Sequence, residues 1–164
     1  MQLTASHLRA LLIYDPDTGI FTRRVDAGKR FKAGMVAGGL GARGYIYIGI
    51  EGKRYLASRL AFLYMTGSWP KIQADHENTI RSDNRWSNLR DATVAQNAAN
   101  ARTHRDNFSG FKGVTFHKLS GLWNARIMVR GTSISLGYFK TPKEANAAYA
   151  RKATEQHGKF ARSA

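Results

Sequence analysis

Residues 75–97 read DHENTIRSDNRWSNLRDATVAQN, and this stretch decides the expected fold of the middle of the chain. Residues 72–76 are expected to form a short strand that leads into a polar loop, and residues 89–92 a second strand. The Thr-Val-Ala-Gln sequence that follows has the spacing of a capping box, which predicts a helix over residues 93–102. This order of strand, loop, strand and helix brings residues from both ends of the stretch to one face.

Three side chains of this stretch suit phosphodiester cleavage. Asp75 and the side-chain oxygen of Asn97 are the kind of ligands that a hard cation such as Mg²⁺ prefers. His76 titrates in the range of a general base. Each residue also has a plainer interpretation, because an Asp-His pair is usually a surface or capping pair, and Asn84 and Asn88 can simply hold turns. The combination, rather than any single residue, favours a nuclease site.

The charge of the chain indicates a polyanionic partner. Its 164 residues include 26 Lys and Arg against 11 Asp and Glu, a formal net charge of +15. Such an excess is typical of proteins that bind nucleic acid. The absence of cysteine excludes disulfides, thiolate nucleophiles and cysteine-bound zinc. No long apolar run and no signal-peptide pattern are present, so we expect a soluble cytoplasmic protein without a membrane partner.

The charges are unevenly distributed. Residues 108–164 contain ten basic and two acidic side chains, whereas four acids lie close together in the middle of the chain. A DNA-binding surface should carry few acids and a metal site needs them, so the two regions are expected to do different work. The acids in the middle are Asp75, Glu77, Asp83 and Asp91.

The first 50 residues carry structural patterns but no functional motif, and structural elements are expected as far as residue 66. A helix is expected from Thr4 to Tyr14, a turn at residues 15–19, a strand at 20–23, a hairpin over 45–56 and a helix over 57–66. Glycine is frequent in residues 34–52, but the Lys-Ser/Thr of a phosphate-binding loop is missing.

The last third is expected to form three strands and one helix. The strands are predicted at residues 111–118, 122–130 and 133–140, and the Thr-Pro-Lys-Glu sequence at 141–144 predicts a capped helix that ends near Gly158. Alternation along the strands gives one apolar face and one face of basic and hydroxyl side chains. Such a sheet can enter the major groove of DNA, although a merely solvated basic face is the plainer alternative.

Tyr55 to Arg102, with its DH…DNRxxNLR…TxxQN pattern, resembles the HNH endonuclease family of phage and mobile-element origin. The resemblance implies a ββα-metal core, in which two antiparallel strands and a helix surround one divalent cation. We expect Mg²⁺ or Mn²⁺ and no zinc, because the oxygen ligands suit a hard cation and the chain has no cysteine for the zinc-bound variants of the family. It implies that His76 is the general base, that Asp75 and Asn97 bind the metal, and that Asn88 buttresses the catalytic loop. Arg85 would shape that loop or contact phosphate.

One position departs from the family pattern. Relatives of this type often read Ala-His-Arg-Leu where this chain has Ala57-Ser58-Arg59-Leu60. Ser58 therefore favours the alternative that the protein is a DNA-binding regulator with a decayed, inactive nuclease core.

Phe108 to Ala161 is similar to the AP2 DNA-binding domain of plant transcription factors and phage endonucleases. The shared features are Gly113-Val114, the GxWxAxI pattern from Gly121, the LGxF pattern from Leu136, the alanine-rich helix and His157-Gly158. The resemblance implies that one face of the sheet binds DNA. The residues expected on that face are Lys112, Thr115, His117, Arg126, Met128, Arg130, Ser133 and Ser135.

Together these observations predict an α+β protein built of modules. An N-terminal helix and hairpin region (1–53) is followed by an HNH core (54–103), a linker (104–110) and an AP2-type sheet packed on one helix (111–164). The expected activity is that of a homing-type, metal-dependent DNA endonuclease acting as a monomer in a bacterial cell. The expected partner is double-stranded DNA, without a small-molecule cofactor. An RNA-binding protein would fit the charge but not the sheet.

Overall fold

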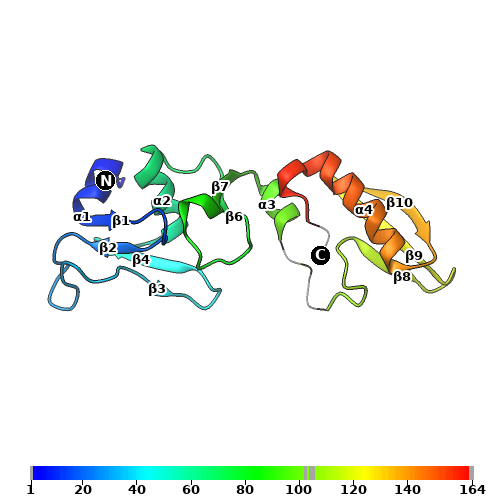
Figure 1. Ribbon diagram of the computed structural model, residues 1–164, viewed down its shortest axis with the longest axis horizontal. Coiled ribbons are helices and arrows are strands. Elements are labelled where there is room, and N and C mark those ends of the chain that lie inside the picture. The colour runs from blue at the N-terminus through cyan, green and yellow to red at the C-terminus, as the bar shows by residue number, and fades with distance from the viewer. Residues whose placement is uncertain (1, 102, 104–105, 163–164) are drawn as a thin grey trace. The chain divides into compact units, whose positions relative to one another are not determined.

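The computed structural model of the protein describes residues 2–101, 103 and 106–162 (Figure 1). The chain divides into two compact units, Met1–Thr93 and Val94–Ala164. Each unit combines helices with small antiparallel sheets, as the α+β expectation requires. Among the described residues no helix has both the length and the apolar character needed to cross a membrane.

The first unit contains three small sheets and two α-helices. The strand pairs are β1-β2, β6-β7 and the three-stranded β3-β4-β5, all antiparallel. The elements are α1 (Ala5–Leu11), β1 (Leu12–Tyr14), β2 (Phe21–Arg23), β3 (Gly39–Leu40), β4 (Ile46–Ile50), β5 (Lys53–Leu56), α2 (Ala57–Thr66), β6 (Gln73–His76), the 3₁₀ helix η1 (Trp86–Asn88) and β7 (Leu89–Ala92).

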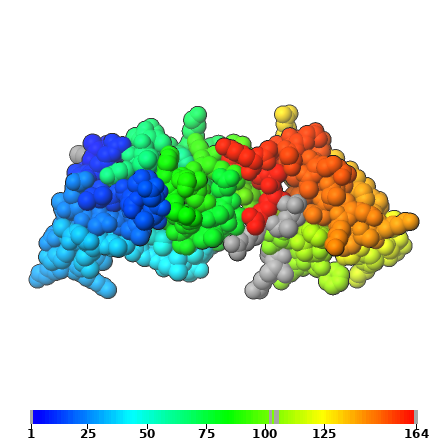
Figure 2. Space-filling view, viewed as in Figure 1, coloured from blue at the N-terminus to red at the C-terminus, as the bar shows by residue number. Residues whose placement is uncertain are grey.

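One hydrophobic core serves this whole unit. Leu8 of α1, Ile48 of β4, Leu60 of α2 and Leu89 of β7 belong to the same buried cluster. Figure 2 shows the early segments, blue and cyan, meeting the green segments on the surface. Burial of apolar area stabilises folds by about 25 cal/mol per Å², and here both sides of the expected boundary at residue 53 contribute to it. Residues 1–53 therefore support the segment that carries the candidate site.

The expected helix from Thr4 to Tyr14 is wrong over its last three residues. The helix ends at Leu11, and Leu12–Tyr14 forms a strand paired with Phe21–Arg23. Leu12 and Tyr14 are buried and the residue between them is exposed, which is the alternation of a half-buried strand. The turn is closed by the Asp15 carboxylate, which accepts hydrogen bonds from Asp17 N and Thr18 Oγ1. The helix over 57–66 and the hairpin over β4 and β5 are confirmed.

The second unit has a three-stranded antiparallel sheet with a long helix packed on it. Its elements are α3 (Val94–Asn100), β8 (Val114–His117), β9 (Leu122–Val129), β10 (Thr132–Phe139), α4 (Pro142–His157) and the 3₁₀ helix η2 (Gly158–Phe160). The strand order is β10-β9-β8. The capping box at Thr141 and Glu144 is present, which confirms the start of α4.

Helix and sheet approach closely in this unit because the contact residues are small. Ala145 and Ala153 of α4 are buried against the sheet together with Tyr149. Gly113 has φ +67°, and a Cβ there would lie 2.4 Å from the Tyr149 ring. The helix α3 was expected within the nuclease core, but it groups with this second unit.

Candidate functional site

Asp75 and His76 end strand β6 and are held by β7. Asp75 pairs with Arg90 and His76 with Leu89 in the antiparallel register. Both side chains are buried, with exposed fractions of 4% and 5%. Titratable side chains are rarely buried without partners, so the contacts of Asp75 and His76 decide what the pair can do.

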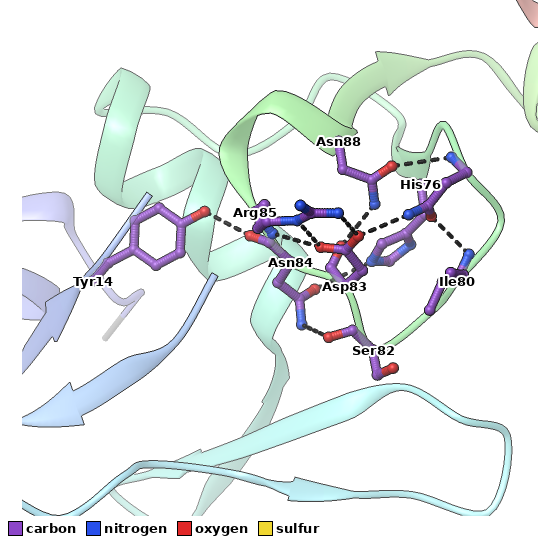
Figure 3. A network of polar contacts seen from close by, with 9 residues as sticks. Tyr14, His76, Ile80, Ser82, Asp83, Asn84, Arg85 and Asn88 are labelled. Atoms are coloured by element: carbon purple, nitrogen blue, oxygen red, sulfur yellow. Dashed lines mark hydrogen bonds and ion pairs between the residues drawn. The ribbon is translucent and has the colours of Figure 1, made fainter. Parts of the chain in front are cut away.

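The His76 imidazole has a defined tautomer. Its Nε2 lies 3.1 Å from Asn84 Oδ1, and Asn84 Nδ2 donates to Ser82 O at 3.2 Å (Figure 3). The bond to Ser82 orients the amide so that its oxygen is the acceptor, and we therefore assign the His76 proton to Nε2. The nitrogen that can accept a proton in neutral His76 is therefore Nδ1.

The surroundings keep His76 neutral at pH 7. Burial is the largest influence and lowers the pKa of His76 below its ordinary 6.5, and the charge of Arg81 adds to this. The hydrogen bond to Asn84 and the nearby carboxylates of Asp75 and Asp83 oppose the change without reversing it. A neutral imidazole of fixed tautomer is what a general base requires.

Asp75 makes an ion pair that the sequence did not predict. Its Oδ2 accepts a hydrogen bond from Arg90 Nε at 2.8 Å, and the Arg90 side chain is 8% exposed. Glu77 Oε1 lies 3.7 Å from Arg90 Nη1. The carboxylate expected to bind metal is therefore held in place by a buried ion pair.

The polar loop between β6 and η1 is tied together by amides and one carboxylate. Asn88 Nδ2 donates to Asp83 O at 2.8 Å, and Asn88 Oδ1 accepts from Asn78 N at 3.0 Å. Asp83 accepts from Arg85 at both carboxylate oxygens, at 2.9 and 2.6 Å, and these bonds lower the pKa of Asp83 to about 2. Arg85, expected to shape the loop or contact phosphate, binds within the loop.

Residues before position 53 hold this loop from the other side. Tyr14 Oη donates to Asn84 O at 2.6 Å (Figure 3), and Trp86 N donates to Pro16 O at 2.9 Å. Gly19 has φ +72°, and a Cβ there would lie 2.3 Å from the Asn84 carbonyl carbon. The sequence did not predict these contacts. The Asp-Pro-Asp-Thr-Gly pattern predicted the turn, but not that the turn packs against the loop beside His76.

An aromatic and basic cluster borders His76. The Tyr45 ring centroid lies 6.0 Å from that of His76, and the Arg81 guanidinium lies 5.0 Å from the Tyr45 ring. Arg81 Nη1 also donates to Arg43 O at 3.0 Å.

Ser58 is buried in α2, with 2% exposed.

Asn97, the second expected metal ligand, lies on α3 in the unit Val94–Ala164, whereas Asp75 and His76 lie in the other unit. A shared metal site therefore stays a prediction. Within residues 2–101, 103 and 106–162, no three His, Asp or Glu side chains form a group that could hold a metal ion.

The second unit exposes seven of the eight side chains expected to face DNA. These are Thr115, His117, Arg126, Met128, Arg130, Ser133 and Ser135. Ser133 pairs with Met128 and Ser135 with Arg126, so they are neighbours across β9 and β10. Tyr138, which sequence reasoning missed, is 49% exposed beside the His117 ring.

Lys112 is the exception, because it is half-buried, and its expected contact with DNA stays a prediction. Its Nζ donates to the carbonyls of Ala98, Ala99 and Ala101 at 2.6–2.9 Å. Burial, with a smaller effect of Arg162, lowers the pKa of Lys112. Carbonyls at a helix C-terminus attract a cation, so Lys112 caps α3 from the strand side.

Comparison with known families identifies the region around His76. Residues 55–99 match the family described as HNH endonuclease. Comparison with curated proteins and with solved structures finds no match. The matched window spans α2, the β6-β7 pair with its loop, and most of α3, so it contains Asp75, His76, Asn88 and Asn97. The chain therefore carries an HNH endonuclease family domain at residues 55–99.

Proposed function

We propose that this protein is a metal-dependent endonuclease that hydrolyses phosphodiester bonds in double-stranded DNA, with His76 as general base. The observation that carries the proposal is the buried His76, whose pKa is lowered by burial and whose Nε2 lies 3.1 Å from Asn84 Oδ1, inside an HNH family domain. Nδ1 takes a proton from water as the water oxygen attacks phosphorus and the bond to the leaving sugar oxygen breaks. Asn84 supports the imidazolium that forms.

The donor set is of the type that suits a hard divalent cation. Asp75 and Asn97 supply carboxylate and amide oxygens, and a carboxylate can accept at both of its oxygens, so the Arg90 pair does not exclude a metal. Mg²⁺ often uses one or two protein ligands and keeps several waters. Such an ion would stabilise the charge that develops on the phosphate. We propose Mg²⁺, with Mn²⁺ as a substitute.

We also propose that the sheet β8-β9-β10 holds the DNA in the manner of an AP2 domain. Its exposed face carries Arg126 and Arg130 among hydroxyl side chains. Arginines position a protein on phosphates or read guanine edges, and small hydroxyl groups allow close approach. The homing-type role and the phage or mobile-element origin rest on the sequence resemblance alone.

The test is cleavage of supercoiled plasmid by the full chain. We expect nicked or linear product with Mg²⁺ or Mn²⁺ and none with EDTA. His76→Ala should abolish the product, while His7→Gln, a change at an exposed histidine, should not. Cleavage by His76→Ala at the parental rate would refute the mechanism.

A second function, DNA binding without cleavage, is favoured by two observations. Ser58 occupies a buried position where the family often has His, and Asp75 is already neutralised by Arg90. This alternative predicts DNA binding that is equal in Mg²⁺ and EDTA and leaves the DNA intact. A gel-shift titration with recovery of the DNA distinguishes the two functions.

A further inference from the structure

The first unit has a pocket whose lining residues lie outside the loop that carries His76. It is a pocket of about 760 Å³ between β1, β2, β4 and the segment of residues 25–36. Most of its wall is apolar, with Leu12, Phe31, Val36 and Ile50 among the lining side chains. Pockets of this size and character typically bind small molecules through a few placed polar groups.

The positively charged group in this wall is Arg23. Its side chain is only 8% exposed, although it lines the pocket, and its Nε has no hydrogen-bond partner. The guanidinium lies 4.8 Å from the Phe31 ring centroid. A buried cation is costly unless an anion or a hydrogen-bond acceptor compensates it. Arg23 therefore places a buried positive charge at the wall of the pocket, which would attract a negatively charged group.

The backbone fixes Arg23 in place. Arg23 N donates to Met35 O and Gly34 N donates to Arg23 O, both at 2.8 Å. The loop that carries Phe31 is fixed as well, because Ala33 N donates to Asp26 Oδ1 at 2.9 Å. A site that is formed before the ligand arrives loses little entropy on binding.

The acids around the pocket limit the charge of the ligand. Asp26 and Glu51 line it, but Asp26 pairs with Lys32 at 2.8 Å and Glu51 with His7 at 2.7 Å. Neither carboxylate pairs with Arg23, and both would repel a second negative charge. Apolar walls, one buried cation and two acids favour a ligand with one anionic end and an uncharged body.

We propose that this pocket binds a small apolar monocarboxylic acid, with its carboxylate on the Arg23 guanidinium and its body against Phe31 and Tyr47. A planar guanidinium matches a carboxylate with two parallel hydrogen bonds. The carboxylate would compensate the buried charge, and the body would cover the apolar wall. The proposed ligand site does not depend on the proposed nuclease function, and each can be tested without the other.

The experiment is calorimetric titration of the full chain with octanoate, 3-phenylpropionate and octan-1-ol. We expect saturable binding of the two acids and none of the alcohol, which has a body like that of octanoate without the charge. The two acids distinguish an aliphatic from an aromatic body. Absence of acid binding to the parent protein, or equal binding of the alcohol, would overturn the proposal.

Variants test the role of the residue. Arg23→Gln should weaken acid binding by about tenfold to a hundredfold, the usual effect of removing a charge-assisted hydrogen bond. Arg30→Gln is the matched control, since Arg30 also lies over the Phe31 ring, at 5.8 Å, but does not line the pocket. Equal loss in both variants would contradict the assignment.

A third variant serves if Arg23→Gln does not fold. Gly49 lines the pocket on the same face of β4 as Tyr47, and a Cβ there meets no atom within 4 Å. Gly49→Leu should therefore fill the pocket without a clash and lower acid affinity. Unchanged affinity in Gly49→Leu would place the acid elsewhere.

Discussion

The hydroxyl of Tyr14 offers a direct test of whether residues 1–53 support the loop beside His76. Tyr14→Phe removes one hydrogen bond, the 2.6 Å contact to Asn84 O, and keeps the ring. The ring stays packed on Phe21, with centroids 4.6 Å apart, so little apolar contact is lost. A buried acceptor left without its donor costs about 1–2 kcal/mol, and we expect that loss in the free energy of unfolding.

The assay is urea unfolding of the full chain followed by circular dichroism, with a thermal melt alongside. A loss of 1 kcal/mol corresponds to about 4–8 °C in a unit of this size. Tyr64→Phe is the matched control, because its ring packs on Tyr14 at 5.7 Å and its hydroxyl has no part in the contact to Asn84. Equal stability of Tyr14→Phe and the parent, or an equal loss in both variants, would refute the claim that the Tyr14 hydroxyl stabilises the loop beside His76.

Three further predictions concern the same unit. Gly19→Ala should destabilise the protein by more than about 2 kcal/mol, because its positive φ and the nearby loop backbone both exclude a Cβ. Gly28→Ala is the control, because Gly28 also has a positive φ but lies in open space, and it should cost about 1 kcal/mol. Thermal melts of the two variants measure the difference. Asp75→Asn should lower the free energy of unfolding by about 3 kcal/mol, because it breaks the buried ion pair between Asp75 and Arg90; an unchanged midpoint in urea unfolding would contradict this. Because the pKa of His76 is lowered in the folded state, the unfolded state binds more protons as the pH falls below 6.5. The stability that neutral His76 contributes is therefore present above pH 6.5 and is lost as the pH falls through the folded-state pKa. Melts of the parent and His76→Gln across this range should therefore converge toward acid pH, and parallel curves would contradict the sign.

Local patterns were sufficient to predict most elements of the fold. The helix Ala57–Thr66 has apolar residues at helical spacing and a glycine at its end, and the structure has the same bounds. The helix α4 begins at its capping box, and β9 alternates as expected except at Asn124. Asn124 is buried on the polar side because it donates to Ser135 Oγ and Gly137 O, where the β10 register shifts.

Contacts between distant residues could not be predicted from such patterns. Leu12–Tyr14 continues a helical spacing but pairs as a strand, since its partner strand and the shared core decide the outcome. The Asp75-Arg90 pair depends on the register of β6 and β7, and the Lys112 contacts depend on where α3 ends. The side chains of the candidate site were named from the sequence, but the residues that fix their charge and orientation were not.

The most direct test of the central claim is single-turnover cleavage of a labelled DNA duplex by parent and His76→Ala protein in Mg²⁺, with duplex binding measured in parallel. We predict that the variant binds the duplex as the parent does and cleaves it about a hundredfold more slowly or worse, because general-base catalysis contributes at least that much. Equal cleavage rates in the two proteins, or a parent that binds the duplex and leaves it uncut, would contradict the account.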